Sequence, residues 1–152
     1  MFDGGTMLDS LRAAGVMPHE IDTIIVSHLH CDHIGGLEVD GEATFTNATV
    51  HIGEGDWQYF VEELGGGRRR ASGLRSIEER VELVDRDGIT ILPGLTTRLT
   101  PGHTPGHLSA IVSSCGWPYD VLARAACFQS GLADTFGRES GDVGLLTRPF
   151  RL

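Results

Sequence analysis

The spacing of apolar residues predicts both helices and strands along the chain. Residues 7–14 place apolar side chains at helical spacing and end at Gly15, which predicts a helix with a glycine stop. A nearly continuous β-branched run predicts a strand at 23–27 that is covered on both faces. Further strands are predicted at 49–53, 89–92, 95–99 and 108–113, and further helices at 56–64 and 74–83. This mixture predicts an α/β fold built in layers, with residues 38–46 as a polar loop.

Three side chains within these elements carry expectations of their own. His51 alternates with apolar Val50 and Ile52, so we expect its ring on the less buried side of the strand. Trp57 and Phe60 lie on the apolar face of the predicted helix. We expect both aromatic rings in the core rather than in a ligand pocket.

Four residues able to bind a metal follow the strand 23–27 within six positions: His28, His30, Asp32 and His33. In an extended backbone alternate side chains point to the same side, so His28 and His30 can hold one divalent ion. Once the chain turns, Asp32 and His33 can point to a second ion, and paired ions stand roughly 3.5–4 Å apart. This density of ligands directly after a strand favours a metal site over a solvated polar loop.

A second motif lies about seventy residues further on, where Thr-Pro-Gly-His occurs twice in succession at 100–107. The Pro-Gly pairs predict tight turns on both sides of His103. A rigid loop of this kind would suit His103 as a third ligand of the first metal. His107 begins the next apolar run, and we interpret it as a structural residue or one that supports the ligands. Cys31 points away from the His28 side by alternation and is not expected to be a ligand.

The two motifs together resemble those of the metallo-β-lactamase-fold hydrolases. The resemblance runs from about residue 6 to residue 114. Segments 53–57 and 91–95 are most similar to the branch of lactonases and methyl-parathion-hydrolase-like enzymes. It implies an αββα sandwich, present here in part, without the N-terminal strands and the C-terminal part of the family fold. We therefore interpret 1–114 as the central part of one such domain and 115–152 as its divergent tail, non-native in sequence or disordered.

The same resemblance implies a site for two zinc ions, with iron, manganese or cobalt as alternatives. The ligands of the first ion would be His28, His30 and His103, and those of the second Asp32, His33 and Asp120. Asp120 is preferred to Asp134 and Asp142 as the bridging aspartate: it resembles the strand-end motif with tyrosine in place of glycine and comes a few residues early, whereas Asp142 has the right neighbours but comes late. The final histidine of the family pattern is absent, since no histidine follows His107. The loss of one of the two ions from this chain is therefore an alternative to the complete site.

The function implied by the resemblance is hydrolysis by a metal-bound hydroxide, with Asp32 orienting the nucleophile. The substrate would be a small lactone, ester, thioester or phosphotriester. The alternative is a catalytically impaired or inactive piece of such a hydrolase that keeps a partial metal site. An RNA-processing nuclease shares the first motif, but the acidic composition and the second motif make it the weaker interpretation.

Composition narrows the partners of this 152-residue chain. A net charge of −9 argues against binding to nucleic acid or to an anionic membrane. Three cysteines without a disulfide pattern fit a reducing cytoplasm, which is the expected location. No apolar run is long enough to span a membrane. Missing strands would leave a sheet edge exposed, so we also expect self-association through that edge.

Overall fold

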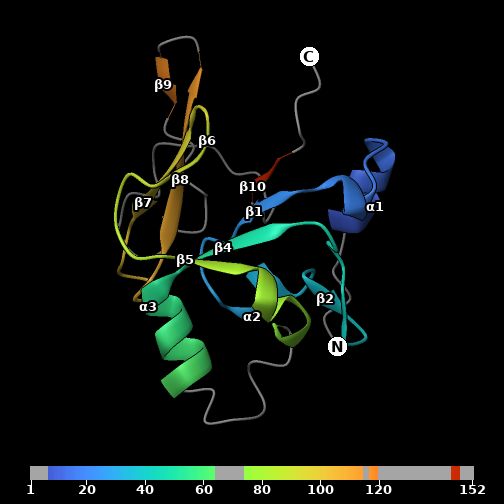
Figure 1. The fold of residues 1–152 in the computed structure, drawn as a ribbon, viewed down its shortest axis with the longest axis horizontal. Helices are drawn as coiled ribbons and strands as arrows, with labels where there is room; N and C mark the ends of the chain where they lie inside the picture. The colour runs from blue at the N-terminus through green and yellow to red at the C-terminus, as the bar shows by residue number, and fades with distance from the viewer. Residues whose placement is uncertain (1–6, 64–73, 115–116, 120–144, 148–152) are drawn as a thin grey trace, which may run out of the picture.

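A computed structural model describes residues 7–63, 74–114, 117–119 and 145–147 of the chain (Figure 1). The first sheet has the strand order β10-β1-β4-β5, formed by Leu145–Thr147, Thr23–Ile25, Thr49–Gly53 and Val81–Val84. The second sheet has the order β6-β7-β8-β9, formed by Thr90–Leu92, Leu95–Leu99, Leu108–Ser114 and Trp117–Tyr119. Strands β1, β4 and β5 run parallel, whereas the second sheet is antiparallel throughout.

The helical elements are short. In chain order they are α1 Met7–Ala13, the 3-10 turn η1 Pro18–Glu20, α2 Cys31–Ile34, α3 Glu54–Asp56, its π-helical continuation η2 Trp57–Glu63, and the 3-10 segment η4 Arg75–Arg80. A two-stranded hairpin, β2 Glu38–Val39 and β3 Glu42–Ala43, lies between α2 and β4. No helix in the described ranges is both long and apolar enough to cross a membrane.

Two apolar clusters give the molecule its layers. On one face of the first sheet, Ile24 and Val50 pack with side chains of α1, η2 and η4. On the other face, Ile25 and Val84 pack with Leu108 and other residues of the second sheet. Neighbouring residues of β1 thus enter opposite clusters, because side chains alternate along a strand. The layers are helix, sheet and sheet, which confirms the predicted α/β layered fold.

Residues 38–46 correct one prediction, because they contain the β2–β3 hairpin and not only loop. Its two-residue turn is Asp40-Gly41, and both residues have positive φ, 52° and 83°. Two consecutive positive φ angles are typical of the type I′ turn that matches the twist of a hairpin. The Asp-Gly pair is the sequence signal for this turn, and the short strands on either side obscured it.

Residues 74–83 correct a second prediction, since a single helix was expected there. The chain instead forms η4 and then enters β5, which pairs with β4 in parallel register from Val81 opposite Val50 to Val84 opposite Gly53. The composition of this segment suits a helix, but pairing with an existing strand satisfies its backbone groups and buries Val84.

His51 is the third correction, because its side chain is buried rather than on an exposed face. Strand β4 lies between β1 and β5, and both faces of this central strand are covered. The ring faces Glu82 of β5 at 3.6 Å from Nδ1 to Oε2. Burial lowers the pKa of His51, and the carboxylate of Glu82 opposes that shift only in part.

This burial makes a prediction about stability and pH. Above about pH 6.5 the ring is neutral in both the folded and unfolded chain, so it adds no pH dependence. Below that value the unfolded chain takes up a proton that the folded one resists, and the free energy of unfolding falls. We expect His51→Gln to reduce the loss of stability between pH 7.5 and 5 in urea titrations. His19→Gln, at an exposed position, should leave that loss unchanged; equal losses in all three proteins would contradict the prediction.

Candidate metal centre

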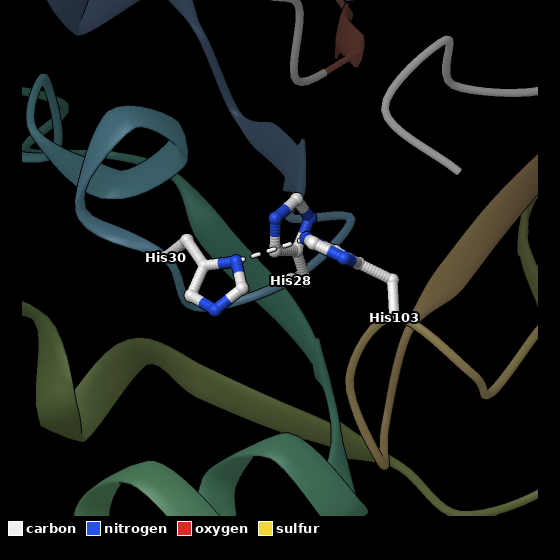
Figure 2. A group of neighbouring side chains, drawn as sticks. All are labelled: His28, His30 and His103. Carbon is white, nitrogen blue, oxygen red and sulfur yellow. Dashed lines mark hydrogen bonds between the residues drawn. The ribbon is translucent and has the colours of Figure 1, made fainter. Parts of the chain in front are cut away.

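Three histidine side chains from two distant segments converge at one end of the first sheet (Figure 2). His28 follows β1, His30 directly precedes α2, and His103 lies in the loop between β7 and β8. One ring nitrogen from each lies within 4.8 Å of the other two. Nδ1 of His30 and Nε2 of His103 are 3.0 Å apart and form a hydrogen bond. The fold thus joins the two motifs that the sequence analysis singled out.

These three rings fit a divalent metal ion. Two nitrogen ligands of a tetrahedral zinc, each about 2.0–2.1 Å from it, stand roughly 3.3 Å apart. The three donors are grouped closely enough to reach such positions by small ring rotations. Three imidazoles with room for a fourth, exchangeable ligand are the donor set of a catalytic rather than a closed structural zinc site. His103 is exposed, so the group is open to solvent on that side.

The protonation state also suits metal binding, because only a neutral imidazole offers its lone pair. Burial, the nearby rings of His33 and His30 and two further histidines lower the pKa of His28 to about 3. Burial and His103 lower the pKa of His30, while the carboxylate of Asp32 acts in the opposite direction. Both rings therefore stay neutral at pH 7.

The residues predicted for a second ion are only partly described. The His33 ring lies against that of His28, with 3.9 Å between centroids, and Ser27 Oγ is within 3.4 Å of a nitrogen on each of these two rings. Asp32 is largely exposed, 3.6 Å from Nε2 of His33. Asp120 and its alternatives Asp134 and Asp142 lie outside the described residues. Among the residues described, the group that could hold an ion is therefore the three-histidine one, and the second-ion ligands stay a prediction.

His107 supports this group from the interior. Its ring is fully buried and stacks on that of His28, 5.3 Å between centroids and 28° between planes. Nδ1 forms a 2.8 Å hydrogen bond with the hydroxyl of Thr100, which also bonds the hydroxyl of Ser109. Its Nε2 has no hydrogen-bond partner among the described residues. The burial and stacking of this ring fit the structural or supporting role expected of it from the sequence.

Two residues of the α3–η2 helix have roles that were not expected from the sequence. The ring of Phe60 packs on the core, as expected, but its edge also meets the His30 ring at 5.4 Å between centroids. Asp56 is fully buried, and its carboxylate accepts backbone hydrogen bonds from Leu29 and Gly106. A single aspartate near a helix start is a common helix-capping signal, so the sequence offered no reason to place it between two histidine loops.

Known proteins with the same fold and motifs define the class. Residues 1–114 match the family model described as the metallo-beta-lactamase superfamily. The structure superimposes with a TM-score of 0.65 on AidC, a dizinc quorum-quenching lactonase solved with a product, N-hexnoyl-L-homoserine. That similarity covers 75% of this chain and 45% of AidC at 27% identity. The chain belongs to the metallo-beta-lactamase superfamily.

Its similarity within the superfamily is to lactonases and related hydrolases. The N-acyl homoserine lactonase AttM of Rhizobium radiobacter is 32% identical over 117 residues, which cover 69% of this chain and 41% of AttM. The probable metallo-hydrolase YqgX of Bacillus subtilis (strain 168) is 32% identical over 118 residues, covering 74% of this chain and 52% of YqgX. The chain thus spans about half or less of the length of these relatives. The similarity agrees with the lactonase-like branch indicated by the sequence motifs.

Proposed function

We propose that this chain forms the metal-binding part of a hydrolase that opens a lactone ring, with N-acyl homoserine lactones as the first substrates to test. The observation that carries the proposal is the convergence of ring nitrogens from His28, His30 and His103 within 4.8 Å. The lactonase names of AttM and AidC support the choice of substrate class. Esters, thioesters and phosphotriesters are chemically related substrates of the same proposed activity.

Each part of the group has a proposed task. A divalent ion bound there supplies Lewis acidity and lowers the pKa of a coordinated water to about 7. His28 and His30 present neutral rings to it from the segment between β1 and α2. His103 provides the third ligand from the loop between β7 and β8 of the second sheet. Asp32, an exposed carboxylate beside His33, is proposed to orient the attacking water and take up its proton.

A second candidate function is metal binding without turnover. It is favoured by the site itself, because the group able to hold an ion among the described residues is the three-histidine one. A chain with the three-histidine group alone would bind one ion and lack the second positive charge that polarises the scissile carbonyl.

Metal content and lactone hydrolysis together separate the two functions. We expect purified protein to open the ring of N-hexanoyl homoserine lactone. The reaction is followed by the proton that the new carboxyl group releases. The activity should be lost after treatment with a chelator. Zinc added back should restore it, and elemental analysis should then give close to two ions per chain. One ion per chain without turnover of a lactone, an ester or a phosphotriester would establish the second function instead. Turnover that survives complete metal removal would contradict metal dependence.

A further inference from the structure

The carboxylate of Asp56 lies between the two segments that supply the histidines. It is 0% exposed and follows directly on β4, at the start of the α3–η2 helix. One oxygen, Oδ2, accepts a hydrogen bond from the backbone N–H of Leu29 at 2.9 Å. The other, Oδ1, accepts one from the backbone N–H of Gly106 at 2.6 Å. Each oxygen of this carboxylate therefore holds a different loop.

The two N–H groups belong to the loops that carry the candidate ligands. Leu29 lies between His28 and His30 in sequence. The orientation of its peptide group therefore affects the directions in which the two histidine side chains point. Gly106 is three residues after His103, at the end of the turn that contains it. The carboxylate thus bridges two segments of the backbone that are more than seventy residues apart in sequence.

Three glycines bring the backbones close enough for this bridge. A Cβ atom added at Gly53 would collide with the carbonyl of Gly106, and one added at Gly106 would collide with the backbone of Asp56. A Cβ at Gly55 would stand 3.1 Å from both Pro105 and Gly106. The end of β4 and the His103 loop therefore touch backbone to backbone, and little space is left for the carboxylate to adjust.

Burying this carboxylate costs free energy, because it loses its hydration, unless hydrogen bonds within the protein offset that loss. Within the described residues Asp56 has no ion-pair partner, and both of its hydrogen bonds go to the histidine loops rather than to its own helix. Hydrogen bonds to an ionised carboxylate are about twice as strong as neutral ones. A fully buried carboxylate whose two hydrogen bonds both go to these loops indicates a function in placing them.

We propose that Asp56 is a positioning residue for the metal centre. Its carboxylate fixes the separation of the His28–His30 segment from the His103 loop, and this separation sets how tightly and in what geometry the three rings bind an ion. The inference rests on the proposed metal-dependent function. The inference adds to that function a residue that touches neither the metal nor a substrate.

The test compares metal binding by the wild-type chain and by Asp56→Asn. The amide has the same shape as the carboxylate, but its NH₂ group would face one of the two backbone N–H groups, so one bridge bond is lost. Affinity for Zn²⁺ is measured by chelator competition, and geometry by the visible absorption of bound Co²⁺. We expect Zn²⁺ affinity to fall about 10–100-fold, as for other groups that orient metal ligands, and the Co²⁺ bands to shift.

A matched control is Asp85→Asn, which makes the same chemical change at an exposed position whose hydrogen-bond partner among the described residues is Arg86. It should keep the wild-type affinity and spectrum. Circular dichroism of the metal-free proteins shows whether each variant is folded. A folded Asp56→Asn protein with unchanged affinity and an unchanged Co²⁺ spectrum would overturn the inference alone. A wild-type chain that binds neither ion would overturn the proposed function and the inference with it.

Amide exchange of the wild-type chain tests the same bridge if Asp56→Asn does not fold. The N–H groups of Leu29 and Gly106 should both be protected, and both should exchange more slowly still when Zn²⁺ is bound. Fast exchange of either amide in the zinc-loaded protein would show that the bridge does not hold its loop, and would overturn the inference.

Discussion

Replacing His103 with alanine is expected to weaken zinc binding by more than about 100-fold. Changes to groups that merely orient a metal ligand already cost 10–100-fold, and this change removes a donor atom itself. The variant should remain folded, because His103 is exposed and contributes to neither apolar cluster. Zinc affinity measured by chelator competition, with thermal unfolding of the metal-free protein alongside, checks both expectations.

The matched control is His19→Ala. His19 is also exposed and precedes a strand, but it lies in η1, outside the three-histidine group. Zinc affinity of that variant should equal the wild-type value. If His103→Ala and His19→Ala bind zinc equally well, His103 is not a ligand and the candidate site is wrong as drawn in Figure 2.

The largest loss of stability is expected from Gly53→Ala. The new methyl group would be driven into the backbone carbonyl of Gly106, and a backbone atom cannot rotate away as a side chain can. Overpacking of this kind typically costs 1–3 kcal/mol, and we expect a value at the top of that range, about 3 kcal/mol, because the sheet and the His103 loop must separate. Urea unfolding of the metal-free protein measures the change.

Gly36→Ala provides the comparison. There the added methyl group also meets an atom at close range, but that atom is the terminal methyl of the flexible Met7 side chain. We expect a loss of less than about 1 kcal/mol, since a different Met7 rotamer relieves the contact. Similar losses for both variants would show that the close approach of Gly53 and Gly106 is unimportant for stability.

The parts of the fold that could be predicted from sequence are those with a clear period or a dense motif. The helix at 7–14 and the strands at 49–53 and 95–99 occur within one residue of their expected bounds. The strand at 23–27 is shorter than expected and ends at Ile25. The Val26 N–H still donates to the carbonyl of His51, and the carbonyl of Ser27 then accepts a hydrogen bond from Leu108 of the second sheet. The three candidate ligands of the first ion follow from strand alternation, the two Pro-Gly turns and the family resemblance, and the structure brings them together.

The remainder depended on tertiary contacts that spacing does not encode. His51 has the alternation of a half-exposed strand, but the strands on both sides of β4 and the second sheet bury it. Residues 81–84 form a strand because β4 offers a parallel partner, not because of their own pattern. Asp56 lies in the segment 53–57 that resembles the lactonase branch, but its contacts could not be predicted, since its two bonding partners are 27 and 50 residues away.

The distance along the chain between His30 and His103, 73 residues, has a consequence for the order of events during folding. His28 and His30 follow β1 of the first sheet, and His103 lies in the loop between β7 and β8 of the second. Three-point capture of an ion therefore requires that the sheets have already docked. Before docking, two of the three ligands, His28 and His30, are near each other because they are two residues apart. Two ligands bind an ion far more weakly than three. Tight uptake of zinc by a refolding chain would therefore report assembly of the sandwich, and zinc would stabilise only the assembled form.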